Sequence, residues 1–329
     1  MTARRGLVIG LAGGVALMGV SGRVPAQSVD RVWLIGIVPG GPMPPRLFQW
    51  NAFRQRMLEL GYAEGRNVRY EVRAPAVEGG AFDGLVADLV NAKVDVIVAT
   101  GNAAIAAARR ASQQIPIVMC PTNDPVGAGL FASLARPGGN LTGISIQTSD
   151  TAGKQLQLLR EWFPKLSRVA FLMNTPVDSK QVDAAQAVAL GAGIQLQTLE
   201  VAAAADALPG ALAAAVKARA EALWVAQTTF TFGNRAQITA LALQNRLPSM
   251  YALAANADAG GLMSYGPNDT GFYKQAAGFV DKILKGARPA DMPVQQPIAF
   301  DLVINRKTAK ALGLTVPQIL LLQVDRVIE

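Results

Sequence analysis

The residue types that most often catalyse reactions or hold metals are scarce in this sequence. It contains no histidine and a single cysteine, Cys120. Histidine is the commonest general base and metal ligand, so its absence excludes Ser/His and Cys/His catalytic pairs. Cys120 follows the apolar run PIVM, where we expect a packed thiol rather than a nucleophile. P-loop spacing, zinc-site spacing and suggestively spaced carboxylate pairs are also missing, so the sequence favours binding over catalysis.

Small and polar residues follow two apolar runs near the beginning of the chain. Gly40 and Gly41 come after the first run, where glycine lets the backbone approach a bound molecule, although a plain turn is the alternative. Their spacing is not that of a dinucleotide-binding G-x-G-x-x-G loop. Thr100, Gly101 and Asn102 separate the run DVIVAT from an alanine-rich helix. Amides at that helix start would favour an anion such as a carboxylate, unless Asn102 merely caps the helix.

A third polar loop, PTNDPVG, occupies residues 121–127. It follows the apolar run that ends at residue 119, and its two prolines restrict the backbone. Thr122, Asn123 and Asp124 are its candidate ligand-binding residues. The Asp124 carboxylate would either accept a ligand's amino group or cap the following turn.

The second half of the chain has a matching set of polar residues. Asn174, Gln227, Thr228 and Tyr251 each follow an apolar run. Amide and hydroxyl groups of this kind orient small ligands through hydrogen bonds. Tyr251 would stack on or hydrogen-bond a ligand, or else pack in the core.

All these loops follow short β-rich runs that alternate with helical runs. Strands are predicted over residues 32–38, 67–73, 95–100, 115–119, 168–173, 194–200, 222–226 and 248–251, with helices between them. This alternation predicts βαβ units and parallel sheets, whose apolar strands are covered on both faces. Trp50 and Trp224 are predicted core residues. Ligands bind beyond the carboxyl ends of such strands, which is where the polar loops fall.

The pattern of alternating strands and helices starts twice, which predicts two α/β lobes. The segment RPGGNLTG at residues 136–143 is rich in turn formers and is the expected linker. Further strands at 260–265 and 298–304, with helices at 270–285 and 306–312, would complete either sheet. The predicted fold class is therefore α/β, with two doubly wound parallel-sheet lobes. A content of 51% hydrophobic and 16% charged residues supports two cores.

The first residues of the chain are typical of an export signal. Arg4 and Arg5 precede an uncharged run over residues 6–20, and VPAQ follows at residues 24–27. The run is shorter than the ~20 residues of a membrane-spanning helix. We expect a signal peptide over residues 1–26, cleaved after Ala26, and a periplasmic protein. The arginine pair leaves open whether export uses the twin-arginine or the general route.

The charge pattern does not indicate nucleic-acid binding. The formal net charge is +8, but the basic residues are scattered and no aromatic residues alternate with them. A nucleic-acid interface needs a clustered basic stripe. A mildly basic surface is the simpler interpretation.

Several segments together resemble the ABC-transporter substrate-binding protein family that includes tryptophan- and tyrosine-binding members. They are 53–67 (FRQRMLELGYAEGRN), 124–130 (DPVGAGL), 136–143, 260–267 (GGLMSYGP), 276–291 and 302–314. The resemblance covers nearly the whole chain after the signal segment. It implies a type 1 periplasmic-binding-protein fold with three crossovers between the lobes. Lobe 1 is expected over 27–144 plus 258–293, and lobe 2 over 145–257 plus 294–329.

The resemblance implies that the chain binds a small-molecule ligand between its lobes and delivers it to the membrane permease of an ABC importer. We expect a monomer that needs no cofactor and no metal. Ligand contacts to both lobes would favour closure about hinges at residues 143–145, 256–260 and 292–296. An exported enzyme on the same scaffold, or a binding protein serving a sensor or another transporter class, is the alternative.

The chain departs from many similar proteins at the presumed ligand site. Those proteins often have Asp where this chain has Thr228, and an Arg-Glu pair where it has Ala254 and Ala255. An amino-acid ligand needs a partner for its ammonium group, which Asp124 can supply and Thr228 cannot. The departures mean that the amino-acid ligands of the family do not carry over directly, and the expected ligand is a small organic solute, either an amino acid or another carboxylate.

Overall fold

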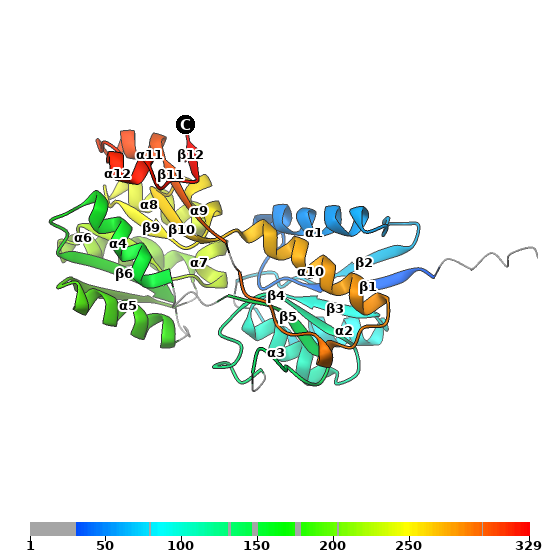
Figure 1. The fold of residues 1–329 in the computed structure, drawn as a ribbon. Helices are drawn as coiled ribbons and strands as arrows, with labels where there is room; N and C mark the ends of the chain where they lie inside the picture. Colours follow the sequence, from blue (N-terminus) through cyan, green and yellow to red (C-terminus); the bar gives the residue numbers. More distant parts are fainter. Residues whose placement is uncertain are drawn as a thin grey trace, which may run out of the picture. The chain divides into compact units, whose positions relative to one another are not determined.

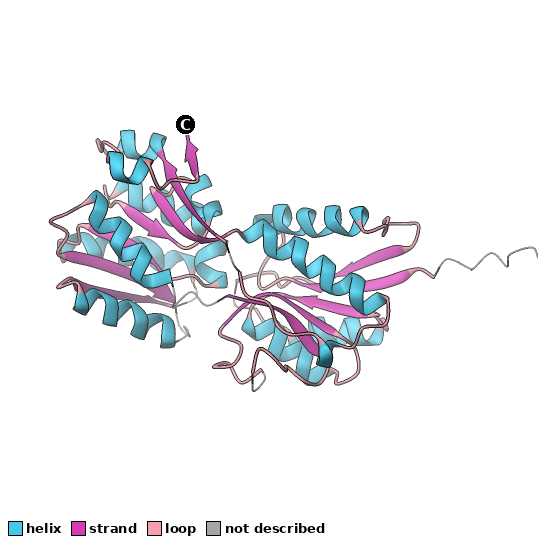
Figure 2. Ribbon diagram, in the orientation of Figure 1, coloured by secondary structure: helices cyan, strands magenta, loops and turns pink. Residues whose placement is uncertain are grey.

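The computed structural model describes residues 31–78, 80–130, 133–146, 151–174, 179–202, 204–297 and 299–329. The predicted signal peptide lies outside these residues. Residues 32–329 form one compact unit built on two β-sheets with helices packed against them (Figures 1 and 2). The predicted α/β class is confirmed.

The first sheet has the strand order β2-β1-β3-β4-β5, and all neighbouring strands are parallel. Its side chains alternate between two cores, as the pleat of a strand requires. Ile35 and Ile37 face the core that contains Trp50, whereas Val38 faces the other core. The strands are β1 (Trp33–Val38), β2 (Val68–Val72), β3 (Val96–Ala99), β4 (Ile117–Asn123) and β5 (Leu141–Ile146), and the helices are α1 (Leu47–Glu59), α2 (Asp83–Asn91), α3 (Asn102–Ala111) and α10 (Asp269–Leu284).

The second sheet has the order β12-β11-β10-β9-β8-β6-β7 and is parallel except for the β10–β11 pair. Phe171 and Trp224 face one core, with Trp224 donating its indole N–H to Gln155 Oε1 at 2.7 Å. The elements are β6 (Arg168–Asn174), β7 (Gln195–Val201), β8 (Ala222–Val225), β9 (Ser249–Tyr251), β10 (Met263–Pro267), β11 (Phe300–Asn305), β12 (Arg326–Ile328), α4 (Ala152–Trp162), α5 (Ser179–Gly191), α6 (Leu208–Lys217), α7 (Thr229–Gly233), α8 (Arg235–Gln244), α9 (Ala254–Asp258), α11 (Arg306–Ala311) and α12 (Gln318–Leu321).

Two predicted boundaries near the middle of the chain are wrong. The segment 136–143 is not a linker throughout, because β5 begins at Leu141 and pairs with β4. Strand β4 continues to Asn123, so Thr122 and Asn123 are its last two residues and do not lie in a loop. A register shift between Met119 and Thr122 lets the strand continue through Pro121, which cannot donate a ladder hydrogen bond.

The later crossovers between the sheets also differ from the prediction in part. Strand β10 pairs with β9 and β11, so the second sheet includes residues that were assigned to lobe 1 as part of 258–293. The chain returns to the first sheet after Pro267, where α10 begins and packs on α1 and β4. The hinge expected at 256–260 is therefore wrong, because α9 and the turn after it pack within the second sheet's own layers.

The first and third crossovers run beside each other. Ile144 of β5 forms an isolated parallel bridge with Gln295, and Ser145 N–H donates to the Gln295 carbonyl at 2.9 Å. Thr142 Oγ1 donates to the Met292 carbonyl at 2.8 Å. The predicted hinge segments 143–145 and 292–296 are therefore hydrogen-bonded to each other, and their role in closure stays a prediction.

Strand β5 approaches β4 closely at Gly143, and a substitution there tests this contact. Its φ is +135°, and a Cβ there would lie 2.3 Å from the Met119 carbonyl oxygen. Gly143→Ala should lower the free energy of unfolding by roughly 2 kcal/mol or more, measured by urea denaturation. The matched control is Gly278→Ala within α10, where a Cβ meets nothing within 4 Å and should stabilise by up to about 1 kcal/mol. Equal stability of the two variants would contradict the packing described here.

Candidate ligand-binding site

The loops after β1 and β3 and the last residues of β4 are hydrogen-bonded to one another. Gly40 N–H donates to Thr100 Oγ1 at 2.6 Å, and Thr100 N–H donates to the Val38 carbonyl at 3.0 Å. Gly101 N–H donates to the Pro121 carbonyl at 3.2 Å. Because these strands are neighbours in the sheet, their carboxyl ends bring the three predicted loops together.

Asn102 does not cap α3. The N-cap position belongs to Gly101, at φ 78°, and no side chain caps the helix. Asn102 instead points across to the end of β4, where its Nδ2 donates to the Asn123 carbonyl at 3.0 Å and its Oδ1 accepts from the Thr122 hydroxyl. The amides at the start of α3 are thus left without a side-chain cap, as an anion-binding helix start requires.

The second sheet presents a similar pair of hydrogen-bonded groups. The Thr228 hydroxyl donates to Asn174 Oδ1. Asn174 is the last residue of β6 and is 7% exposed. Thr228 also caps α7, through a capping box with Thr231. Gln227 N–H donates to Gln181 Oε1 at 2.7 Å. The strand order places β6 beside β8, which explains why these residues meet.

Tyr251 is a core residue and does not belong with the other predicted ligand-binding residues. Its side chain is 1% exposed and packs among Leu172, Leu223 and Val225. Burial raises the pKa of its hydroxyl. The packing alternative for Tyr251 is confirmed, as is core packing for Trp50 and Trp224, which are 0% and 2% exposed.

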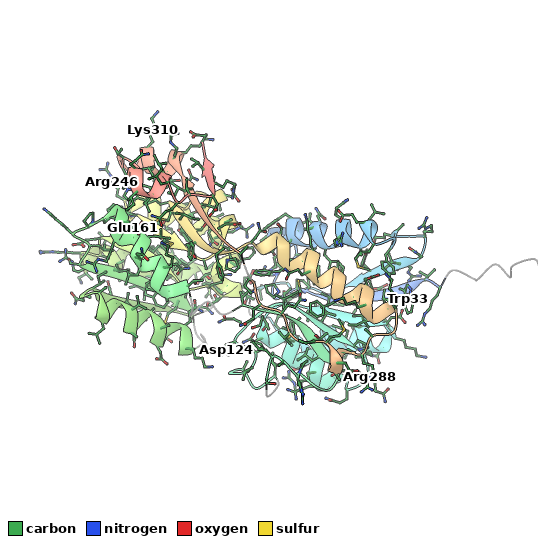
Figure 3. All side chains as sticks on the ribbon, viewed as in Figure 1. Trp33, Asp124, Glu161, Arg246, Arg288 and Lys310 are labelled. Carbon is green, nitrogen blue, oxygen red and sulfur yellow. The ribbon has the colours of Figure 1, made fainter. Side chains whose placement is uncertain are left out.

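An ion pair joins the loop after β4 to the first turn of α5. Lys180 Nζ lies 2.7 Å from Asp124 Oδ2. The other carboxylate oxygen, Oδ1, accepts the Gly127 N–H at 3.1 Å. Asp124 lies beyond the end of β4 (Figure 3) in the left-handed conformation, at φ 37°. Aspartate tolerates this conformation better than most residues.

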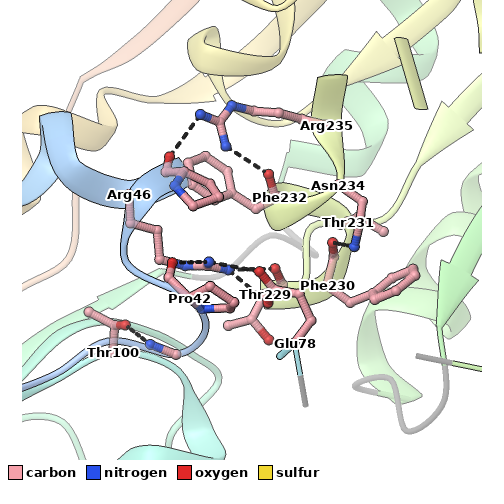
Figure 4. A network of polar contacts seen from close by, with 12 residues as sticks. Pro42, Arg46, Glu78, Thr100, Thr229, Phe230, Thr231, Phe232, Asn234 and Arg235 are labelled. Atoms are coloured by element: carbon pink, nitrogen blue, oxygen red, sulfur yellow. Dashed lines mark hydrogen bonds and ion pairs between the residues drawn. The ribbon is translucent and has the colours of Figure 1, made fainter. Parts of the chain in front are cut away.

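A second ion pair lies at the loops after β1 and β2 (Figure 4). Arg46 donates to both carboxylate oxygens of Glu78, at 2.8 and 3.0 Å, and to the Thr229 carbonyl at 2.8 Å. It also donates to the Pro42 carbonyl at 3.0 Å. The side chain of Arg46 is 3% exposed and that of Glu78 12%. The first sheet therefore supplies the ion pair, and the start of α7 supplies a further acceptor.

Arg235 forms a second polar link beside this pair. It donates to the Pro45 carbonyl at 2.8 Å and to the Phe232 carbonyl at 3.0 Å. Its guanidinium lies 4.6 Å from the centre of the Phe232 ring, within cation–π distance. The Arg46 guanidinium lies 5.8 Å from the centre of the same ring, so two cations lie within 6 Å of Phe232.

Glycines allow the two groups of loops to approach closely. A Cβ at Gly40 would lie 2.8 Å from the Thr229 methyl group, and a Cβ at Gly101 would lie 3.0 Å from it. A Cβ at Gly41 would lie 2.3 Å from Glu78 Oε2. Gly40 and Gly41 were predicted to let the backbone approach a bound molecule. In the structure they let the backbone approach other residues of the protein.

Arg46, Glu78, Lys180 and Arg235 were not among the predicted site residues. Arg46 is the last residue of a 3₁₀ turn over Pro44–Arg46 and the N-cap residue of α1, and Glu78 lies in the loop after β2. No local sequence pattern marks any of these four charged residues as part of a site. Nothing in the sequence alone pairs residues separated by 32 positions, as Arg46 and Glu78 are.

Cys120 is fully buried, and its burial raises the pKa of the thiol, as the prediction of a packed side chain requires. Within the residues that the structure describes, no group of three or more Cys, Asp or Glu side chains could hold a metal ion. In the same part of the chain, no helix is long and apolar enough to cross a membrane.

The buried ion pair should be expensive to break. Glu78→Ala leaves a buried guanidinium without its counter-ion and should lower the free energy of unfolding by about 3 kcal/mol or more, measured by urea denaturation. The double variant Arg46→Met/Glu78→Met should lose less than Glu78→Ala. The control is Asp83→Ala, which breaks an exposed pair with Arg110 and should cost about 1 kcal/mol at most. Equal costs for Glu78→Ala and Asp83→Ala would contradict the burial.

Glu78 should also give stability a specific pH dependence. Burial raises its pKa above the ordinary 4.5, and the attraction of Arg46 offsets only part of this effect. The folded protein therefore holds this proton more tightly than the unfolded chain, so the contribution of Glu78 to stability is largest below pH 4.5 and declines as pH rises through the folded-state pKa. The unfolding free energy of the wild type relative to Glu78→Gln should fall over that range. A difference that rises with pH would contradict this assignment.

Comparison with known proteins agrees with this architecture. The family model of the ABC transporter substrate binding protein matches residues 44–328. A tyrosine-binding protein of Clostridioides difficile is 26% identical over 264 residues, which cover 80% of this chain and 75% of that protein. The structure of an ABC domain in complex with L-Trp from Streptococcus pneumonia has a TM-score of 0.80 at 24% identity, covering 90% of this chain and all of the other. A conserved domain protein from Vibrio cholerae has a TM-score of 0.83 at 23% identity, with the same coverage. The fold is that of type 1 periplasmic binding proteins, and the chain belongs to the ABC transporter substrate-binding protein family.

Proposed function

We propose that this protein is the solute-binding component of an ABC import system, which binds an amino acid or another small carboxylate and delivers it to a membrane permease. The observation that carries the proposal is the meeting of polar loops from the carboxyl ends of both sheets. Thr100, Asn102 and Asp124 come from one sheet, and Asn174 and Thr228 from the other. Ligands of open parallel sheets bind at these ends.

The chemistry of these loops suits a small zwitterion or anion. The uncapped start of α3 and the hydroxyl of Thr100 would bind a carboxylate. The Asp124 carboxylate is fixed by the Gly127 amide and Lys180, and it would bind an ammonium group. Asn174 and Thr228 add neutral donors and acceptors from the second sheet. The hydrogen bonds among these residues hold their rotamers before a ligand arrives, which lowers the entropy lost on binding.

The proposed ligand class agrees with the names of the relatives, which include a tyrosine-binding protein and a domain in complex with L-Trp. We extend this to the present chain as an amino acid or a related carboxylate. The protein would act in the periplasm after removal of the signal peptide over residues 1–26, as a monomer and without catalysis. Closure about the paired segments 143–145 and 292–296 would accompany binding.

Binding is tested by thermal shift and then by isothermal titration with the common L-amino acids and their deaminated carboxylates. A ligand at 100 times its Kd should stabilise the protein by about 2.7 kcal/mol by mass action. Asn102→Ala and Asn174→Ala should each weaken binding by about tenfold, because each removes hydrogen bonds on one side of the site.

The control is Lys217→Ala, which removes an exposed side chain from the last turn of α6 and should leave Kd unchanged. Binding that responds to neither asparagine substitution would place the ligand elsewhere. Conversion of any of these compounds to a product would instead favour the enzyme alternative.

A further inference from the structure

Asp124 is held in a way that leaves one carboxylate oxygen for a cation. Oδ1 accepts the Gly127 amide at 3.1 Å, and Asp124 N–H donates to the Ile146 carbonyl at 3.2 Å. A Cβ at Gly127 would lie 1.9 Å from Oδ2, so the glycine makes room for that oxygen. The side chain is 14% exposed. A fixed and largely buried carboxylate oxygen binds a cation more strongly than an exposed one.

Lys180 supplies that cation from the other side of the site. Its Nζ lies 2.7 Å from Oδ2, and its side chain is 58% exposed. Lys180 lies in the first turn of α5, where the helix dipole disfavours a positive charge and where there is no acidic residue. The dipole of α5 therefore does not favour a lysine at this position, whereas the Asp124 carboxylate does.

We infer that the Lys180 ammonium occupies the place on Asp124 that a ligand's amino group takes, so that Lys180 is a built-in competitor that sets the selectivity between amino-bearing and deaminated ligands. This inference rests on the proposed function. An amino acid must exchange the lysine ammonium for its own, and because the Lys180 side chain is 58% exposed, water can solvate the displaced ammonium. A deaminated carboxylate leaves the Asp124–Lys180 pair intact.

The strength of the pair sets the size of the effect. Ion pairs with one exposed partner contribute about 0.2–1 kcal/mol, which corresponds to a factor of about 1.5 to 5 in Kd. Removal of Lys180 should therefore tighten the binding of an amino acid by about 1.5- to fivefold. It should leave the binding of the deaminated analogue unchanged.

The test is isothermal titration of the mature protein with L-tyrosine and with 3-(4-hydroxyphenyl)propanoate, and with L-tryptophan and indole-3-propanoate as a second pair. Lys180→Met should tighten binding of the two amino acids alone. Lys217→Ala, which removes the same charge from the end of α6, should change neither. Asp124→Asn should weaken amino-acid binding, and adding Lys180→Met to it should then have no effect.

Two results would overturn the inference while leaving the proposed function intact. If Lys180→Met weakens amino acids and deaminated analogues equally, the lysine binds the carboxylate that both share. If it changes neither Kd while the wild type binds both, the lysine does not compete. Failure of the wild type to bind either pair would overturn the proposed ligand class, and the inference with it.

Discussion

The Arg46–Glu78 pair is the interaction on which the arrangement of the site loops depends. A guanidinium that is 3% exposed requires acceptors for its donors, and it finds them in Glu78, in Pro42 and in the Thr229 carbonyl. Two of these acceptors belong to the loops of the first sheet and one to the start of α7. Losing any of them would leave a buried charge partly unpaired, which costs several kcal/mol. The pair therefore connects three segments that are distant in the sequence, namely those around Arg46, Glu78 and Thr229 (Figure 4).

The polar side chains at the strand ends are hydrogen-bonded within the protein. Thr100, Asn102 and Thr122 bond to neighbouring loops of their own sheet, and Asn174 and Thr228 bond to each other. Each group is thus satisfied before a ligand arrives, as buried polar atoms must be. In the proposed function, a ligand would exchange hydrogen bonds at this site rather than meet unpaired atoms. Selectivity would then depend on which hydrogen bonds and ion pairs a ligand can replace, as proposed for Asp124 and Lys180.

Much of the fold was predictable from the sequence because apolar runs and turn residues report local structure directly. Strands β1, β3 and β8 and helices α1, α4 and α10 lie within a few residues of their predicted positions. Strand β5 was missed because Gly138, Gly139 and Gly143 read as turn formers, whereas Gly143 serves the close contact with β4. The membership of β10 in the second sheet could not be predicted, since pairing between strands is not a local property.

The site was predictable to the extent that it follows strand ends. Five predicted residues lie at or just beyond the carboxyl ends of parallel strands, as expected: Thr100, Asn102, Asp124, Asn174 and Thr228. Tyr251 is buried in the core instead, because packing of its ring outweighs exposure of its hydroxyl. The roles of Arg46, Glu78 and Lys180 depend on tertiary pairing and had no sequence signal.

The measurement that tests the account most directly is a crystal structure of the mature protein with a bound amino acid. The account predicts a ligand that contacts Asp124 from the first sheet and Asn174 or Thr228 from the second. A ligand held by residues of one sheet alone, or bound away from these loops, would contradict it.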